Sequence, residues 1–385
     1  MKYPFSGIIV RYLRNGSTPD TAVTPTDELH VNLWEVSRRR FIDIGVLINE
    51  PSKISALQVD IPWQIDHTKV FDLGSRLVGE KILAAIFNDV VQYSGTNDST
   101  FAEVSFPNTA PPRKFILARL SSQDFTIEQV VLSDGSITTR LKVRVPDLTT
   151  LSNPAGMLYI RFRIIDVPEE NYTSIFSQKD RNILSSSLET RIVDFRVNVR
   201  RGTPDDILAN QVDLKFPRWK KIHVFMTLDR TRELTFSNEK FVDCRSLEDE
   251  AIWNSYIALD TNIGREESVS NYLGYQWTSK SEGNSPAKDL VALARFSKVS
   301  SSKTYVLRFI SLALILGAAG NGIWSIVNEF ISQDNSNSTE NWKALGLLSL
   351  IFSLIIYFPP IANRLIKKTL TLGKKFWINM KRWIA

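Results

Sequence analysis

Two long apolar runs near the carboxyl end constrain this chain most. The first runs from Phe309 to Val327 and the second from Ala344 to Asn363, and neither contains a charged residue. A helix needs about 20 apolar residues to cross the hydrocarbon core of a bilayer. A helix in lipid also satisfies its own backbone amides and carbonyls. The runs therefore predict a transmembrane helical hairpin, with helices at 305–331 and 342–363 joined by a short external loop at 332–341.

The charges that flank the two runs predict the orientation of the hairpin. Basic residues precede the first run and follow the second, whereas the loop carries Asp334 and Glu340 but no Lys or Arg. Because basic flanks stay on the cytoplasmic side, we expect both termini in the cytoplasm and the protein in the inner (plasma) membrane of the cell. The apolar run near the amino terminus, Gly7 to Val10, is too short for a secretory signal.

The first run also contains candidates for helix packing or for the wall of a pore. These are Ala313, Gly317, Asn321 and Gly322. Small residues at four-residue spacing let helices approach closely in lipid, and an amide in the apolar zone favours a polar partner. The same spacing suits packing against the second helix of the hairpin, so both interpretations stay open.

Residues 364–385 predict a basic amphipathic helix in the headgroup layer of the membrane. Basic residues recur there at seven-residue spacing, and the apolar side chains fall mainly on the other side. The residues expected to contact anionic lipids are Arg364, Lys367, Lys368, Lys374, Lys375, Trp377, Lys381, Arg382 and Trp383. This segment contributes +7 to the net charge of +6, which leaves −1 for the rest of the chain. The basic balance is therefore no evidence that the body binds nucleic acid.

The residues before about residue 300, here called the body, are predicted to form mainly strands. Apolar and polar residues alternate over Leu29–Trp34, Leu57–Trp63, Arg113–Leu120 and Phe125–Leu132, which is the pattern of half-buried strands. The short spacing between strands predicts a mainly β, antiparallel, sandwich-like body with few helices. Residues 1–150 and 151–279 are expected to be its two parts, as one domain or two.

Three helices are expected beside these strands. An apolar stripe predicts one within Asp72–Val91, and Ser246 is the expected cap of another that runs towards Leu259. The third is a juxtamembrane helix over Pro286–Phe296, since proline is common at the first helical position. Residues 280–304 are accordingly assigned to a linker and this helix.

Three of the expected strands carry basic side chains on one face. These residues are Arg140, Lys142, Arg144, Arg161, Arg163, Arg196 and Arg200. If the strands are neighbours, the side chains line one sheet face that suits the phosphates of a nucleotide or a nucleic acid. The alternative is the solvated face of a sheet, which the net charge of the body favours. Lys215–Lys221, with Phe216 and Trp219 between basic residues, suits stacking on single strands or protection of a sheet edge.

Nothing in the sequence indicates catalysis. The histidines His30, His67 and His223 are far apart along the chain, and no catalytic, metal-binding or phosphate-loop motif is present. We therefore expect no catalytic residue, no cofactor and no metal. Cys244 is the sole cysteine, which excludes an internal disulfide and fits a reducing compartment. It is expected to be a buried structural thiol.

The layout of the chain, with a body before Phe309–Val327 and Ala344–Asn363, resembles membrane effectors of prokaryotic antiviral immunity that have two transmembrane helices. The resemblance implies a non-enzymatic protein in which a ligand or a cytosolic protein partner clusters the bodies as a homo-oligomer, and the hairpins then breach the membrane. The alternative is a membrane-tethered binding or scaffold protein whose hairpin is only an anchor.

Overall fold

The computed structural model describes most of the body and part of the first apolar run. The described residues are 3–16, 24–36, 39–96, 99–110, 113–148, 156–177, 187–209, 213–258, 269–300, 309–310, 312–314, 316–317, 320–322 and 324. The chain divides into two compact units. The first comprises Met1–Phe176 and Thr190–Lys298, and the second comprises Ser177–Glu189 and Val299–Ala385.

The first unit is built around a large mixed sheet, here called the central sheet. Its strands in spatial order are β17 (Phe241–Ser246), β18 (Tyr272–Lys280), β15 (Trp219–Asp229), β2 (Asp27–Val36), β3 (Arg39–Ile48), β11 (Leu158–Ile165), β8 (Arg113–Ala118), β7 (Phe101–Phe106) and β6 (Gln92–Ser94), with β5 (Val70–Asp72) paired to β11. Neighbouring strands are antiparallel except for two parallel pairs, β15 with β2 and β11 with β8. Because β11 pairs with β3, the central sheet crosses the boundary expected near residue 150.

Two smaller sheets complete the strands that the structure describes. The second sheet has the order β14 (Leu214–Lys215), β1 (Ile9–Arg14), β4 (Ile54–Ile61), β10 (Ile137–Arg144) and β9 (Phe125–Val131). The third sheet has the order β12 (Thr173–Ser177), β13 (Ser187–Val197), β19 (Leu290–Ser300) and β16 (Glu233–Ser237). The expectation of a mainly β body is confirmed.

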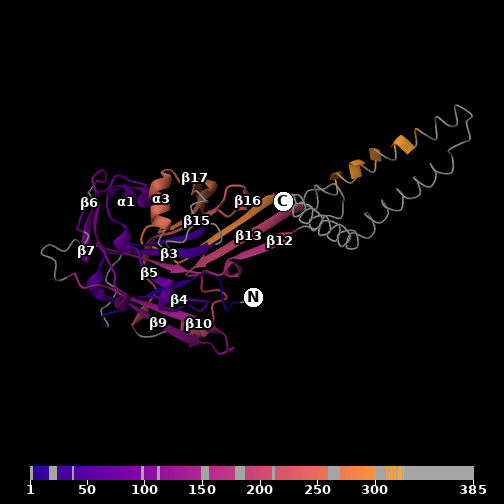
Figure 1. The fold of residues 1–385 in the computed structure, drawn as a ribbon. Helices are drawn as coiled ribbons and strands as arrows, with labels where there is room; N and C mark the ends of the chain where they lie inside the picture. Colours follow the sequence, from indigo (N-terminus) through magenta and orange to yellow (C-terminus); the bar gives the residue numbers. More distant parts are fainter. Residues whose placement is uncertain are drawn as a thin grey trace, which may run out of the picture. The chain divides into compact units, whose positions relative to one another are not determined.

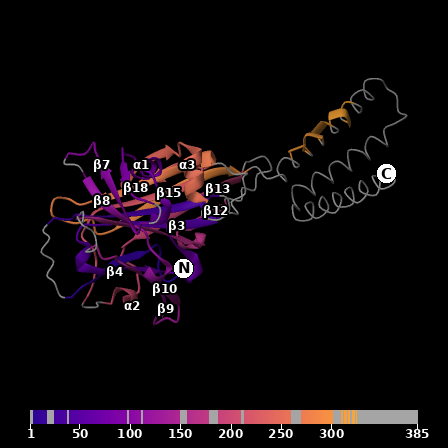
Figure 2. The same ribbon diagram turned by 60° about the vertical axis from the view of Figure 1, so that its left-hand side comes forward.

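The hydrophobic core lies between these sheets. Alternate residues of β2, such as Leu29 and Val31, pack there with Val59 of the second sheet and Phe195 of the third. The opposite face of the central sheet carries a second apolar cluster, in which Trp34 and Phe115 meet Leu83 and Trp253 from two helices. Figures 1 and 2 show this layering, with α1 and α3 on one side of β3 and β15 and with β4, β9 and β10 on the other.

The helices of the body are short. The described segments contain α1 (Glu80–Phe87), α2 (Asp205–Leu208) and α3 (Glu250–Ile257), with 3-10 turns at Pro51–Lys53, His67–Lys69, Gly74–Arg76, Ser122–Asp124, Glu169–Asn171 and Val269–Asn271. The helix expected within Asp72–Val91 is confirmed only as α1, because Gly79 before it and Asn88 after it have positive φ. Asp249 caps α3 through a hydrogen bond from the amide of Ile252, whereas the expected cap, Ser246, ends β17.

The prediction of a juxtamembrane helix over Pro286–Phe296 is wrong. Leu290–Ser300 form β19, where the buried residues Leu290, Ala292, Ala294 and Phe296 alternate with more exposed ones. Tertiary packing of this face overrides the helix-start signal at Ser285, because period-two burial is the pattern of a strand. The linker expected at 280–285 is a tight turn with a bridge between Glu282 and Ser285.

The second unit contains the described part of the first apolar run. Its residues between Phe309 and Trp324 are helical, and Phe309, Ile310, Leu314, Leu316 and Trp324 are exposed. Within the described portion of the chain, no helix has both the length and the apolar character required to span a bilayer. Most of the predicted hairpin, including its loop and second helix, lies outside the described residues, as does the predicted basic helix at 364–385.

Candidate functional site

A cavity of about 320 Å³ lies on the helix-covered face of the central sheet. The face follows from strand alternation, because Leu29, Val31 and Leu33 enter the core between the sheets and His30 points the other way. The residues that line the cavity are Glu28, His30, Asn32, Ile86, Phe87, Asn88, Arg113, Arg161, Lys221, His223, Phe225, Asp243, Arg245 and Gln276. They come from the central strands, from α1 and from the edge strand β17.

Strand register aligns a row of five residues beneath this cavity, and His223, His30 and Arg161 among them line it. The row consists of Thr278, His223, His30, Gly45 and Arg161, each opposite the next on the adjacent strands β18, β15, β2, β3 and β11. The imidazole rings of His30 and His223 lie 5.5 Å apart between centroids. The parallel pairing of β2 with β15 therefore joins two histidines that are far apart in the sequence.

Gly45 leaves the space into which two polar groups of the floor extend. A Cβ atom at this position would lie 2.2 Å from Tyr159 Oη and 3.1 Å from Arg161 Nη1. Both distances are too short for ordinary van der Waals contact, so a side chain on β3 here would displace one of these groups. The glycine thus allows the Arg161 side chain to run across β3 towards the histidines.

Arg161 is fully buried, yet its guanidinium is only partly hydrogen-bonded. Its Nε donates to Tyr256 Oη at 2.8 Å, and its Nη1 donates to Tyr159 Oη at 3.0 Å. Its Nη2 has no hydrogen-bond partner in the part of the chain that the structure describes, and the carboxylate oxygen Asp43 Oδ2 lies 3.8 Å from it. A buried, unpaired donor on a cation is costly, and the residue that carries it is among those around the cavity.

The network beneath Arg161 does not balance its charge. Asp43 accepts from Arg163 at 2.5 and 3.0 Å, from Trp34 Nε1 at 2.8 Å and from Tyr256 Oη at 2.7 Å. Its oxygens are therefore fully used by Arg163 and two neutral donors. Two buried guanidiniums face one buried carboxylate, which leaves an excess positive charge at the floor of the cavity.

The walls of the cavity add more positive charge. Arg113 donates to Glu28 at 2.9 Å, and although burial opposes ionisation of Glu28, its hydrogen bonds with His30 and Arg113 hold its pKa well below the usual range. Arg245 lies over the ring of Phe225, with 5.3 Å to the ring centroid. Burial lowers the pKa of Lys221. Four cationic side chains thus line the cavity against the two carboxylates of Glu28 and Asp243.

Both histidines are neutral in this environment. His30 approaches Glu28 at 3.5 Å and Tyr159 Oη at 3.3 Å, and His223 Nδ1 lies 2.8 Å from the hydroxyl of Thr278. Burial lowers the pKa of His30, and burial with the neighbouring His30 and Lys221 lowers the pKa of His223 to about 3. Among the residues that the structure describes, no group of three His, Cys, Asp or Glu side chains is placed to hold a metal ion.

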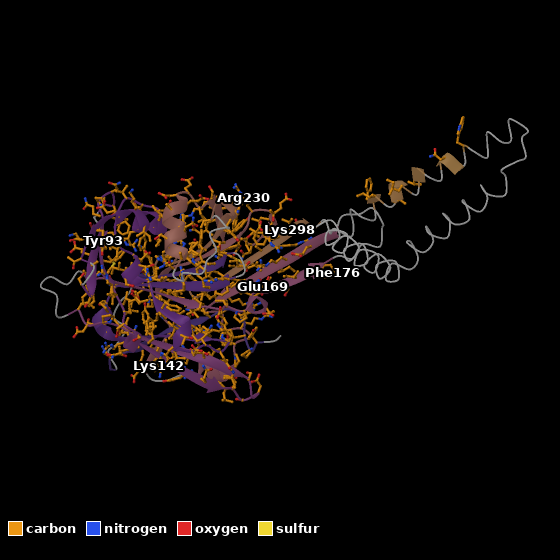
Figure 3. All side chains as sticks on the ribbon, viewed as in Figure 1. Tyr93, Lys142, Glu169, Phe176, Arg230 and Lys298 are labelled. Carbon is orange, nitrogen blue, oxygen red and sulfur yellow. The ribbon has the colours of Figure 1, made fainter. Side chains whose placement is uncertain are left out.

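The seven residues of the expected anionic-ligand face do not share one face, because their strands belong to three different sheets. On β10, Arg140 pairs with Asp60, Lys142 with Glu128 and Arg144 with Asp124. Lys142 lies at the bottom of Figure 3, in the layer away from α1 and α3. On these strands the carboxylates satisfy the basic side chains, as in the solvated or structural interpretation.

The other basic residues of the expected anionic-ligand face also lie apart from one another. On β13, Arg196 pairs with Asp194, and beyond the strand Arg200 lies 4.2 Å from the ring centroid of Phe216. On β11, Arg163 is held by Asp43, and Arg161 alone lines the cavity. Trp219 of Lys215–Lys221 is fully buried, so the expected aromatic clamp does not form.

Sequence reasoning missed the histidine pair at the centre of the site. The signal was weak, since Leu29-His30-Val31 and Ile222-His223-Val224 have the same alternation but nothing indicates that their strands pair. The prediction for Cys244 was wrong, because this thiol is exposed on β17. The candidates of the first apolar run, Ala313, Gly317, Asn321 and Gly322, are helical, and their packing partners stay a prediction.

Comparisons with known proteins do not identify a family for this chain. No protein-family model matches the chain, and no curated protein matches it in sequence.

Proposed function

We propose that this chain is a membrane-anchored receptor for a small anionic molecule, which binds in the cavity on the central sheet. The observation that carries the proposal is the excess buried charge, with Arg161 and Arg163 facing one carboxylate, Asp43. Taking an uncompensated charge out of water is expensive. An anion in the cavity supplies the missing counter-charge.

The membrane anchor of this proposal is the predicted hairpin, with the body on the cytoplasmic side of the plasma membrane. The sequence supports it through two uncharged runs and their basic flanks. The described helical residues add support, because Phe309, Leu314 and Trp324 expose large apolar side chains. Water disfavours such exposure, whereas lipid does not.

The anion site is tested with full-length protein in detergent, using sulfate as the probe at constant ionic strength. Sulfate is expected to raise the thermal unfolding midpoint, because a ligand that binds only the native state stabilises it by mass action. The double variant Lys221→Gln/Arg245→Gln removes two cations from the cavity. It should weaken sulfate binding by about tenfold, since each charge-assisted contact is strong.

The matched control is Lys142→Gln/Arg144→Gln, which changes the charge equally but on β10 of the second sheet. This control should bind sulfate like the unaltered protein. Equal losses in the two double variants would reduce the effect to general electrostatics and would refute the cavity as the site. Native mass spectrometry of the purified protein, with Lys221→Gln/Arg245→Gln alongside, then identifies the natural anion.

A second candidate function is that of an effector that breaches the membrane. In it, the bodies of several copies cluster and bring their hairpins together. Gly317 and Asn321 favour it, because they are exposed on the same helical segment at four-residue spacing. Over-expression promotes clustering by mass action and is expected to lower the membrane potential, followed with a voltage-sensitive dye. Replacing the hairpin with an unrelated one should abolish this effect. A replacement that leaves the effect intact would favour the tethered scaffold.

A further inference from the structure

We infer that the charged group taken by this cavity is a tetrahedral oxyanion of the phosphate type rather than a carboxylate, and that His223 takes up a proton when this group binds. The inference rests on the proposed anion site and adds its ligand class and its proton linkage. It follows from how the donors around the cavity are already engaged.

The first step concerns the shape of the anion. A carboxylate is recognised best by a guanidinium that offers two parallel N–H groups. Arg161 cannot offer them, because Nε and Nη1 are committed to Tyr256 and Tyr159 and Nη2 is buried beside Asp43. The cavity instead supplies donors from separate strands, with Arg113 on β8, Lys221 on β15 and Arg245 on β17. Donors that converge from several directions suit the oxygens of a tetrahedral anion.

The second step concerns the proton. His223 Nδ1 is fixed by the Thr278 hydroxyl and lies 3.2 Å from Gln276 Nε2, so the ring has a defined orientation beside the cavity. His30 is held between Glu28 and Tyr159. His223 is therefore the imidazole whose contacts leave one nitrogen for a ligand that enters the cavity. Because the Gln276 amide nitrogen donates to Nδ1, the neutral ring carries its proton on Nε2 and already donates from the nitrogen that is left for a ligand. Protonation therefore adds positive charge beside the cavity rather than a new donor.

The third step is the charge that surrounds His223. The titratable and charged groups around it are Lys221 on its own strand, Glu28 and His30 on β2, Lys280 on β18, Arg161 on β11, Arg113 on β8, and Asp243 and Arg245 on β17. Cations outnumber carboxylates, which together with burial keeps the pKa of His223 low when the cavity holds no anion. A bound dianion reverses this balance, because an opposite charge nearby favours the charged form of a group.

The test compares sulfate, a tetrahedral dianion, with oxalate, a planar dicarboxylate dianion, on full-length protein in detergent. Neither probe titrates between about pH 6 and about pH 8, so a change in affinity over this range reports protein groups. We expect sulfate to bind about five- to tenfold more tightly at the lower pH, with oxalate at least about tenfold weaker than sulfate. Calorimetry in two buffers of different ionisation enthalpy should show that sulfate binding takes up protons.

The variant His223→Gln should lose the gain in sulfate affinity between about pH 8 and about pH 6. His67→Gln, at an exposed histidine away from the cavity, should keep the gain. The two-buffer calorimetry needs no variant, so it decides the proton linkage even where His223→Gln fails to fold.

Two outcomes would overturn the inference and leave the anion site intact. One is sulfate binding that is unchanged by pH and takes up no proton, and the other is oxalate binding more tightly than sulfate. A third outcome, in which neither dianion binds, would overturn the proposed function itself. The failures of the two proposals are thus distinguishable.

Discussion

Gly45 is the residue on which the shape of the cavity floor depends most. It lies on β3 between His30 and Arg161 in the polar row, and its missing side chain makes room for Tyr159 Oη and Arg161 Nη1. Gly45→Ala inserts a methyl group where the nearest atom would be 2.2 Å away. Tyr159 is fully buried, so its hydroxyl has little room to yield. We expect a loss of about 1–3 kcal/mol in the free energy of unfolding, measured by urea denaturation.

Gly156→Ala is the matched control for this substitution. Among the described residues, no atom lies within 4 Å of the position that its new Cβ would occupy. It should change stability by less than about 1 kcal/mol, in the direction of stabilisation, because alanine restricts the unfolded chain. If Gly45→Ala were as stable as Gly156→Ala, the floor would not need the space that the glycine provides, and the approach of Arg161 across β3 would lose its explanation.

At the scale of single elements, Tyr256 links α3 to the central sheet through two buried hydrogen bonds. Tyr256 Oη accepts from Arg161 Nε at 2.8 Å and donates to Asp43 Oδ2 at 2.7 Å. Tyr256→Phe keeps the ring and removes both hydrogen bonds. The expected cost is about 1–3 kcal/mol, because buried partners are left unsatisfied. Hydrogen exchange should also speed up in α3.

The comparison for this prediction is Tyr93→Phe on the edge strand β6. Tyr93 Oη also accepts from an arginine, Arg119 Nη2 at 2.7 Å, but at a partly buried site where water replaces the lost partner. We expect a cost below about 1 kcal/mol for it. Equal costs for the two tyrosine variants would contradict the special position of Tyr256 under the cavity.

The sequence pattern predicts some of the strands correctly and misses others. The alternation of β2, β4, β8, β9, β10 and β11 is visible in the sequence, because each has one face in a core. β19 was missed because Ser285 and Pro286 imitate a helix start, while the burial of Ala292 and Ala294 depends on partners far away in the chain. The site needs strand pairing as well. Only the register of β15 with β2 brings His223 next to His30, and local pattern does not specify that register.

At the scale of the whole molecule, the buried histidines predict a distinctive loss of stability in mild acid. An unfolded histidine has a pKa of about 6.5, whereas burial lowers the pKa of His223 to about 3 and also lowers that of His30. Between these values the unfolded chain binds more protons than the native protein. Stability is therefore full above about pH 6.5 and falls as the pH decreases towards 3.

The size of this effect is measurable before the carboxylates protonate. From pH 7 to pH 5, His223 alone should cost about 2 kcal/mol in the free energy of unfolding. Urea denaturation of full-length protein in detergent, in a buffer without multivalent anions, measures it. His223→Gln should make the profile less steep over this range, whereas His67→Gln, at an exposed position, should leave it unchanged. A flat profile in the unaltered protein would mean that His223 titrates normally.

The last prediction concerns lipid as the solvent of the first apolar run. Leu316 and Gly317 lie near its middle, and both are helical and exposed. A charged residue at the centre of a membrane helix costs about 2.5–3.5 kcal/mol in insertion experiments. The double variant Leu316→Arg/Gly317→Arg should therefore shift much of the protein from the membrane pellet to the supernatant after alkaline extraction. Leu316→Ala/Gly317→Ala, which stays apolar, should remain in the pellet. If the unaltered chain were found in the supernatant without detergent, the run would be an interior or interface helix of a water-soluble assembly, and the receptor would have no anchor of its own.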